Sequence, residues 1–477
     1  MASRPKSQSS SRMRTEQDSL GSKLLPADVY YGIQTLRAIE NFQISGLRSR
    51  PAFIRAIARI KRAAAEANLR LGLLRPTMAR AIIAASQEMI DGRHDDQFRV
   101  DVYQAGAGTS FNMNANEVIA NRALELLKKR RGDYEAVNPN DHVNMAQSTN
   151  DIIPTSIRLA SLDLLQSLDR SLEMLERACL TKGREFRRVV KSARTHLQDA
   201  VPIMLGRDFQ AYGRMVGESR RRLRQVAQAL CELNIGGTAA GTGLNAHPRY
   251  QQLVVQRLRA LTGQPLRPAQ DLVAIMQSMA DFADLSGALN TLAVDLTKIA
   301  NDLRLLASGP RTGWFEINLP ALQPGSSIMP GKVNPVMPEM LNMVCYQVMG
   351  NHLTVTMAAQ AGQLELNVMM PLIAHNLIFS LEILTHATNA LATKCIGGIT
   401  ANVKRCRDYA EKSVSIATVL NPLIGYQKTA KLVQEAIARD VSFLDLALQH
   451  RIADPKRLRQ MLDPARLAEP HAGRRAR

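Results

Sequence analysis

The chain has 477 residues, which is enough for about three domains around a large buried core. Only 4% of the residues are aromatic, whereas alanine, leucine, methionine and arginine are plentiful, and this composition favours helices over sheets. No apolar run is long enough to span a membrane and no signal-peptide core is visible, so we do not expect a membrane protein. The five cysteines are scattered and form no CxxC pair, which predicts reduced thiols in a cytoplasmic protein.

The net charge of +19 is unusual for a metabolic enzyme. It is compatible with nucleic-acid binding, with steering of anionic substrates, or with solubility alone. Part of it lies at the ends of the chain, and residues 1–14 contain four basic residues and no acid. We expect residues 1–14 to form a disordered basic tail, although their Arg- and Ser-rich composition also resembles an organelle-targeting peptide.

The N-terminal part of the chain is predicted to be helical after an initial loop. Residues 18–32 have the composition of a loop, and two helices are predicted over residues 51–92, separated near Gly72 and Pro76. A further helix opens at residues 106–110 and carries several asparagines, at 112, 114, 116 and 121. Asparagine is a poor helix former because its amide competes for backbone groups, so this number indicates a polar network near a site.

Hydroxyl side chains lie at the starts of two predicted helices. Thr109 and Ser110 begin the asparagine-rich helix, and Ser148, Thr149 and Asn150 precede a long helical pattern. Free N–H groups and the helix dipole at such a start favour an anion. Each cluster can cap only its own helix, or it can also hold a carboxylate.

A third polar cluster contains Thr195 and His196. A lone histidine is usually structural, so the cluster by itself leaves the role of His196 open. The glycine-rich residues 236–243 have no following Lys-Ser/Thr pair and no preceding strand, which argues against a phosphate cradle. We expect a tight loop there that lets helices approach one another.

Long helices are predicted over residues 208–233, 269–307 and from about 337 to 391. Seven apolar residues in the second of these repeat in alternating steps of four and three: Leu285, Leu289, Leu292, Leu296, Ile299, Leu303 and Leu306. This a/d seam is typical of a long helix packed in a bundle.

The sequence therefore predicts an all-α protein with three folded parts after the basic tail. We expect an N-terminal helical domain at residues 15–147 and a central long-helix bundle domain at 148–402. The helices of residues 403–477 are predicted to be short, because prolines and glycines interrupt them, and should form a small C-terminal helical domain.

A loop with the sequence GSSIMPGKVNP at residues 325–335 interrupts this helical chain. Two glycines and two prolines cannot lie together inside a helix, so the segment is a loop between long helices. It carries Ser326 and Ser327 as hydroxyls, Lys332 as a cation and Asn334 as an amide donor. Such a loop is either a solvated connector or a mobile segment of an active site that binds an anion.

The order of residues in this loop resembles the signature loop of the aspartase/fumarase superfamily, lyases that release fumarate by elimination across a carbon–carbon bond. The resemblance extends over nearly the whole chain and includes all three polar clusters. It implies three mostly helical domains and a homotetramer in which each active site takes residues from three chains. No cofactor motif and no metal-ligand spacing is visible in the sequence, and none is expected.

The resemblance also implies roles for individual residues. Ser326 matches the catalytic base, which acts as an alkoxide on the carbon next to a carboxylate and gives an aci-carboxylate intermediate. A serine pKa is too high for this unaided, so helix starts, Lys332 and exclusion of water must lower it. The other positions match residues that hold the β-carboxylate (Thr109, with Ser110 beside it, Ser148, Thr149 and Ser327), the α-carboxylate (Lys332 and Asn334), and the leaving group (Asn150, Thr195 and His196, the last paired with Glu339).

Details of the sequence favour the aspartase branch, which eliminates ammonia from L-aspartate, over fumarate hydratase, which acts on L-malate. Fumarases usually have serine at the position of Thr149 and tryptophan at that of Leu305. Residues 236–238 and 374–376 and Met370 look more like a fumarase. A non-catalytic basic protein that binds nucleic acid is the remaining alternative; the charge is its only support, since no basic segment interleaved with aromatics is present.

Overall fold

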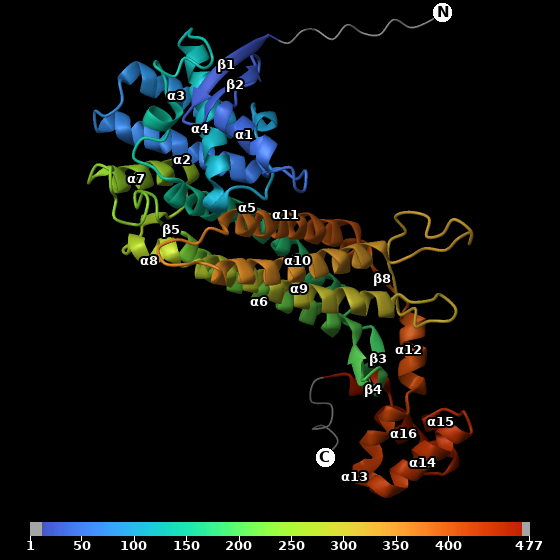
Figure 1. The fold of residues 1–477 in the computed structure, drawn as a ribbon. Coiled ribbons are helices and arrows are strands. Elements are labelled where there is room, and N and C mark those ends of the chain that lie inside the picture. The colour runs from blue at the N-terminus through green and yellow to red at the C-terminus, as the bar shows by residue number, and fades with distance from the viewer. Residues whose placement is uncertain (1–11, 470–477) are drawn as a thin grey trace, which may run out of the picture. The chain divides into compact units, whose positions relative to one another are not determined.

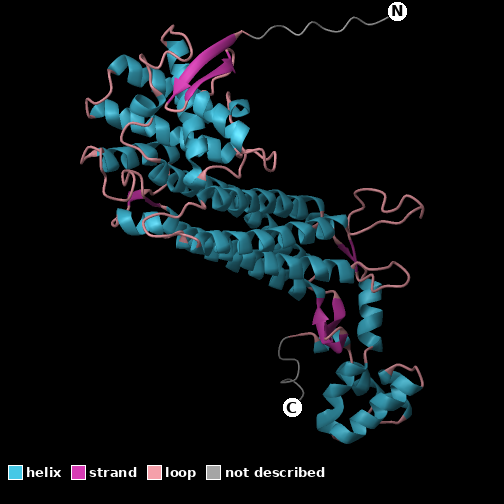
Figure 2. Ribbon diagram, in the orientation of Figure 1, coloured by secondary structure: helices cyan, strands magenta, loops and turns pink. Residues whose placement is uncertain are grey.

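The computed structural model describes residues 12–469 and is mostly helical, with 63% of residues in helices (Figures 1 and 2), as the composition predicts. The chain divides into two compact units, each assembled from segments distant in sequence. The first consists of the described residues up to 168 together with 222–291 and 347–383; the second consists of 169–221, 292–346 and the described residues from 384 onward. The predicted domain boundaries at residues 147 and 402 stay a prediction.

The first unit begins with a hairpin that the sequence does not predict. Strands β1 (Met13–Asp18) and β2 (Gly21–Pro26) pair antiparallel, with Met13 opposite Pro26. Arg14 is fixed in this hairpin, because its guanidinium donates to the carbonyl oxygens of Val29 and Tyr31 at 2.7 Å each. The expectation of a tail through residue 14 is therefore wrong for Arg14, and residues 1–11 lie outside the described part of the chain.

Helices α1 to α4 form the rest of the N-terminal part of the first unit (Figure 1). Their bounds are α1 Ile33–Asn41, α2 Pro51–Arg70, α3 Pro76–Ile90 and α4 Thr109–Leu126. The two helices predicted over 51–92 are confirmed, and each begins with proline at its first position, where the missing N–H costs nothing. Alanines on the buried face of α2 let α3 pack closely against it.

Five long helices follow, and each of them has residues in both units. They are α5 Thr149–Glu185, α6 Leu205–Leu230, α9 Ala280–Leu306, α10 Val336–Gln360 and α11 Met370–Lys394. All seven apolar residues of the predicted seam in α9 are buried, none more than 5% exposed. The helical period therefore identified the buried face correctly.

Two predicted long helices are each broken once. The helix predicted over 269–307 divides into α8 (Leu272–Gln277) and α9, because Ser278 takes an extended conformation. The run from 337 to 391 divides into α10 and α11. The Asn367 amide donates to the carbonyl oxygens of Ala358 and Ala359 at 2.9 Å and so satisfies the end of α10.

The second unit contains the hairpin of β3 (Val190–Thr195) and β4 (Gln198–Met204) and the pair of β7 (Ile317–Asn318) with β8 (Thr400–Ala401). The short C-terminal helices pack around their own apolar cluster, which includes Leu420, Phe443 and Leu458. The bounds of the C-terminal helices are α12 Val403–Lys412, α13 Asn421–Ile424, α14 Tyr426–Ala438, α15 Phe443–Gln449, α16 Pro455–Met461 and α17 Pro464–Leu467.

The remaining short elements belong to the first unit, where β5 pairs in parallel with β6. Their bounds are β5 Glu232–Leu233, α7 Tyr250–Thr262 and β6 Arg267–Pro268. Between residues 12 and 469, no helix combines the length and the apolarity needed to cross a lipid bilayer.

Candidate functional site

In the first unit the structure brings the first two polar clusters together. Helix α4 begins at Thr109, directly after Gly108 in the left-handed region (φ 89°), and α5 begins at Thr149. The two starts pack closely, because a Cβ at Gly108 would lie only 3.0 Å from Cγ1 of Ile153 in α5. The Asn112 amide, one of the asparagines of α4, donates to Oγ1 of Thr149 at 3.3 Å. The predicted polar network at the helix starts is therefore present.

The turn at Ser148 is held by two hydrogen bonds, one that Ser148 donates and one that it accepts. The Ser148 N–H donates to Oδ1 of Asp151 at 3.0 Å, and the Asn150 N–H donates to Oγ of Ser148 at 3.2 Å. The other oxygen of Asp151 accepts the N–H groups of Gly236 and Thr238, each at 3.0 Å. Burial raises the pKa of the Asp151 carboxyl, although these backbone donors oppose the shift.

The glycine-rich loop therefore has a role that the sequence analysis missed. It anchors the turn of the second cluster, and the Asn150 side chain also donates to its Ala239 carbonyl at 2.8 Å. Gly236 has a positive φ of 96°, which turns its N–H toward Asp151. The run of glycines is the available signal, and by itself it predicts only a tight loop between closely packed helices.

Lys61 of α2 is a second residue that the sequence analysis did not single out. It is fully buried, and its Nζ donates to Oδ1 of Asn144 and Oε1 of Gln147 at 2.9 Å each. These residues directly precede Ser148, so Lys61 supports the segment that leads into the turn. Burial lowers the pKa of Lys61 to about 7, and the Asp151 charge opposes this shift. A lysine among alanines in a helix gives no sequence signal of such a role.

In the second unit the β3–β4 hairpin presents Thr195 and His196 at its tip. Thr195 pairs with Gln198, so His196 and Leu197 form a two-residue turn. Both have positive φ values, 57° and 58°, as the turn favoured by strand twist requires. Neither is glycine, asparagine or aspartate, so the conformation is strained, and such strain often accompanies a functional constraint.

The predicted loop at residues 325–335 is present and closed by its own hydrogen bonds. The Gly325 N–H donates to the Lys332 carbonyl, and the Asn334 amide donates to the Gly325 carbonyl, both at 2.7 Å. A Cβ at position 325 would lie 2.6 Å from the Lys332 carbonyl oxygen, so this closure requires glycine. The side chain of Lys332 is exposed, and so is Ile328, which is 83% exposed at the loop apex. With so little of it packed, the loop has the properties of a segment that can move.

Ser326 is oriented within this loop by its backbone neighbours. Its Oγ accepts the N–H groups of Ile328 at 3.2 Å and Met329 at 3.1 Å. Two N–H donors aimed at one hydroxyl oxygen favour its deprotonated form. The adjacent Ser327 is exposed. The two serines therefore differ, because only the Ser326 oxygen accepts backbone N–H groups of the loop.

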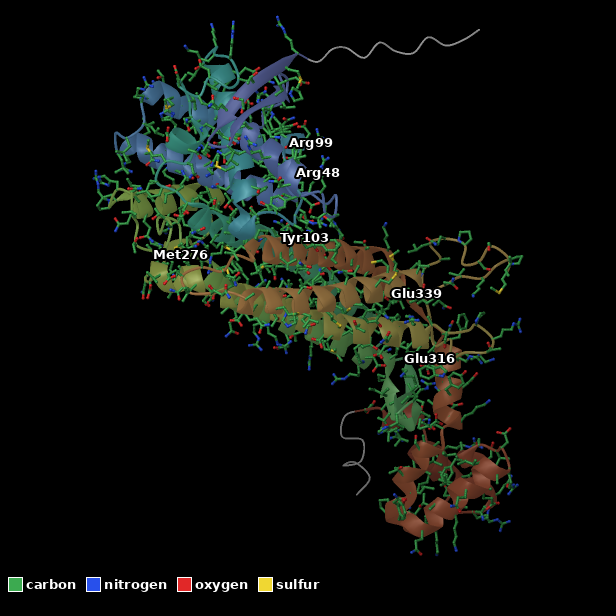
Figure 3. All side chains as sticks on the ribbon, in the orientation of Figure 1. Arg48, Arg99, Tyr103, Met276, Glu316 and Glu339 are labelled. Atoms are coloured by element: carbon green, nitrogen blue, oxygen red, sulfur yellow. The ribbon has the colours of Figure 1, made fainter. Side chains whose placement is uncertain are left out.

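Several predicted residues are not joined to one another within the chain. Glu339 lies in the first turn of α10 (Figure 3), and within residues 12–469 neither its carboxylate nor the exposed His196 ring forms a hydrogen bond or an ion pair. The side chains of Thr109, Ser110 and Ser327 likewise have no hydrogen-bond partner in the described chain. The hydroxyl groups of Thr109, Ser110 and Ser327 therefore keep their donors available for a ligand.

The combined inventory consists of hydroxyls, amides, one imidazole and one exposed lysine. Neutral donors with a single ammonium suit a small dicarboxylate that gains charge during a reaction. A serine whose oxygen faces two N–H groups suits a general base or a nucleophile. Among the described residues, no group of three or more His, Cys, Asp or Glu side chains could hold a metal ion.

Comparisons with known proteins agree with this inventory. Residues 21–350 match the family described as Lyase, and residues 416–469 match that described as Fumarase C C-terminus. The aspartate ammonia-lyase of Bacillus sp is 48% identical over 464 residues, which cover 97% of this chain and 99% of that protein. That of Pseudomonas aeruginosa is 50% identical over 460 residues, covering 96% and 97%.

Two solved structures share the fold over the full length of their chains. A Brucella melitensis protein described as fumarate lyase:delta crystallin, bound to cobalt, matches with a TM-score of 0.93 and 51% identity, covering 96% of this chain and 100% of that one. The class II fumarase of Schistosoma mansoni matches with a TM-score of 0.91 and 38% identity, with the same coverage. With a family match over more than half of its residues and relatives of this identity along its length, the chain belongs to the aspartase/fumarase family of lyases.

Proposed function

We propose that this protein is an aspartate ammonia-lyase, which reversibly eliminates ammonia from L-aspartate to give fumarate. The observation that carries the proposal is Ser326, whose oxygen faces two backbone N–H groups in a loop beside an exposed lysine. The identity of about one half with named aspartate ammonia-lyases supports this substrate over L-malate. Thr149 and Leu305, which stand where fumarases usually have serine and tryptophan, also support it.

The reaction begins with removal of a proton by the Ser326 alkoxide. The proton leaves the carbon next to the β-carboxylate, and the electron pair moves into that carboxylate to form an aci-carboxylate. The N–H groups of Ile328 and Met329 stabilise the alkoxide, because a hydrogen bond to a charged acceptor is stronger than one to a neutral acceptor. Lys332 and exclusion of water on loop closure lower the serine pKa further.

The two carboxylates of the substrate are held by different groups. Hydroxyls bind the β-carboxylate, where charge accumulates, and each donor aimed there contributes about 10²–10³ in rate. Lys332 and Asn334 bind the α-carboxylate, Lys332 through its charge and Asn334 through its amide. The β-carboxylate donors are Thr109, Ser148, Thr149 and Ser327, with Ser110 next to them.

The leaving amine is bound by Asn150, Thr195 and His196. Protonation makes the amine a better leaving group, and collapse of the aci-carboxylate expels it as the carbon–nitrogen bond breaks. Glu339 pairs with His196 from another subunit and orients its ring. This pairing explains why neither side chain has a partner among residues 12–469 of its own chain.

We also propose a homotetramer in which each active site uses residues from three chains. Four exposed apolar residues lie on one face of α10: Met343, Tyr346, Leu353 and Met357. Each is more than half exposed, and their spacing keeps them on one side of the helix. An uncovered apolar face of this length is unfavourable in water and fits a helix–helix interface between copies.

The function is tested by following fumarate at an ultraviolet wavelength after adding L-aspartate or, separately, L-malate to the purified protein. Fumarate from aspartate alone is the expected result. Fumarate from malate alone would make the protein a fumarate hydratase, and no fumarate from either substrate would overturn both assignments. A cytoplasmic location is supported by the five cysteines, all free and buried.

Shared active sites are tested by mixing two inactive variants, Ser326→Ala and Thr149→Val, after reversible dissociation. If one site draws these residues from different chains, some sites in the mixed tetramers contain neither substitution. We expect activity to reappear in the mixture but not in either variant alone. Mixtures that remain inactive, although mixed tetramers form, would contradict the sharing of sites.

A further inference from the structure

A buried ion pair in the second unit joins the hairpin that carries His196 to the segment that leads into the Ser326 loop. The side chain of Glu316, which Figure 3 labels, is fully buried, and Nη1 of Arg194 lies 3.0 Å from each of its carboxylate oxygens. Arg194 precedes His196 by two residues in β3, and Glu316 precedes the loop at 325 by nine residues. The pair therefore connects two segments that both carry candidate site residues.

The carboxylate end of this pair is held by the backbone on both sides. The Glu316 N–H donates to the Leu306 carbonyl at the end of α9 at 2.8 Å, and the Glu316 carbonyl accepts the Asn402 N–H at 2.9 Å. The next residue, Ile317, begins β7, which pairs with β8. Glu316 is consequently a fixed point between α9 and α12.

The guanidinium end is held by aromatic rings. The Cζ atom of Arg194 lies 4.1 Å from the centre of the Trp314 ring and 5.5 Å from that of Tyr409. The strand pairing shifts register between Ser192 and Arg194, an irregularity that redirects the side chain. Arg194 also donates to the Ser192 carbonyl at 3.3 Å, so the position of β3 near its tip is tied to the guanidinium.

Stability alone is a poor explanation for this arrangement. Removing two charges from water costs several kcal/mol per ion, and well-packed apolar residues are often equally stable in the place of a buried ion pair. A charged pair with two hydrogen bonds does, however, fix a direction as well as a distance. The hairpin tip needs such fixing, because His196 and Leu197 occupy a strained turn that is exposed.

We propose that Arg194 and Glu316 are positioning residues that set the place of Thr195 and His196 at the tip of the hairpin, without touching substrate. The inference rests on the proposed function, because His196 acts there on the leaving amine. A displacement of about 1 Å at a reacting group can cost about 10²-fold in rate. Loss of the ion pair should therefore lower kcat far more than it weakens substrate binding.

The test compares three variants of the pair with a matched control. Arg194→Met removes the guanidinium, Arg194→Lys keeps the charge but loses the planar guanidinium, and Glu316→Gln keeps the shape and one acceptor. The control is Arg220→Met, because Arg220 of α6 is similarly buried and pairs with Asp169 and Glu176, both on α5 and in the same unit. It removes a similarly buried arginine that belongs to α6 and not to the hairpin.

We expect Arg194→Met to lower kcat about 100-fold while KM for aspartate and the inhibition constant of succinate change less than about threefold. Arg194→Lys and Glu316→Gln should lie between this variant and wild type, and Arg220→Met should stay within about threefold of wild type. A purely structural role predicts that every variant of the pair loses kcat and substrate affinity by similar factors and also has a lower melting temperature. That result would overturn the proposal.

A second readout does not depend on turnover. Trp314 is the only tryptophan in the sequence and lies against Arg194, so its fluorescence reports on the ion pair directly. We expect Arg194→Met to change the Trp314 emission and to increase hydrogen exchange in residues 190–204, with no such change in Arg220→Met. Unchanged exchange at the hairpin would also overturn the proposal. If wild type gives no fumarate from aspartate, the proposed function fails, whereas fluorescence and exchange still decide whether the pair holds the hairpin.

Discussion

The substitution Ser326→Ala removes the oxygen on which the proposed mechanism depends. General-base catalysis contributes about 10²–10⁴-fold, so kcat should fall by that factor, or about 3–5 kcal/mol in activation free energy. The two N–H groups that donate to Oγ contribute to this loss of kcat, because they stabilise the alkoxide that acts as the base. A hydrogen bond to a charged acceptor exceeds one to a neutral acceptor by about 1 kcal/mol, so the two bonds to Oγ lower the pKa of the Ser326 hydroxyl.

The neighbouring serine provides a matched control. Ser327→Ala removes the same atom one residue later, at a hydroxyl that has no hydrogen bond in the described chain. It should weaken binding of the β-carboxylate and lower kcat by about 10²-fold, the lower end of the range for one donor. Both variants are measured by the appearance of fumarate from L-aspartate, with succinate inhibition as a check on binding.

Folding should be almost unaffected by either change, because the loop is exposed and contributes little to the core. A melting temperature within a few degrees of wild type would therefore accompany the loss of turnover. Activity of Ser326→Ala within tenfold of wild type would refute the assignment of the base. A larger loss in Ser327→Ala than in Ser326→Ala would transfer the role to the other hydroxyl.

Three further predictions concern the same loop and the first unit. Lys332→Met should raise KM for aspartate about 100-fold or more through loss of the charge facing the α-carboxylate, and unchanged steady-state constants would exclude that role. Gly325→Ala should lower kcat more than tenfold with an unchanged melting temperature, because the new Cβ would press on the Lys332 carbonyl 2.6 Å away and open the loop; wild-type kinetics would show that the closure is dispensable. The hydrogen bond from Arg122 holds the pKa of Glu88 at about 2, well below its ordinary 4.5. A lowered carboxyl pKa stabilises the fold above the unfolded value, so this contribution is lost as pH falls from about 4.5 to about 2. Denaturant unfolding at pH 7 and pH 3 should show a smaller loss on acidification in Glu88→Gln than in wild type, and equal losses would contradict the linkage.

The parts of the fold that follow from local rules were predictable from the sequence. The helix starts at Pro51 and Pro76 have proline where its missing N–H is harmless, and the apolar seam of α9 has the period of a buried helix face. The loop at 325–335 was also evident, because two glycines and two prolines exclude a helix. In each case the residues that determine the local structure lie within one short stretch of sequence.

Features that depend on distant partners were not predictable in the same way. The β3–β4 hairpin has two non-glycine residues at a turn that normally favours glycine or asparagine, so its sequence lacks the usual turn signal. The contact of Asp151 with the glycine-rich loop joins residues 85 positions apart. Lys61 supports the Ser148 segment from a similar distance in sequence, and a buried lysine is not marked by periodicity.

The choice of donors in the proposed site is itself informative. A second ammonium near the β-carboxylate would bind substrate and intermediate alike, and such uniform binding lowers KM without raising kcat. Neutral hydroxyls interact weakly with the substrate carboxylate and more strongly as charge accumulates on it, provided that they are already oriented. The structure orients Thr149 through Asn112 and Ser148 through its own turn. We infer that the networks behind the helix starts serve catalysis by fixing these neutral donors, so that the gain in binding falls on the intermediate rather than on the substrate.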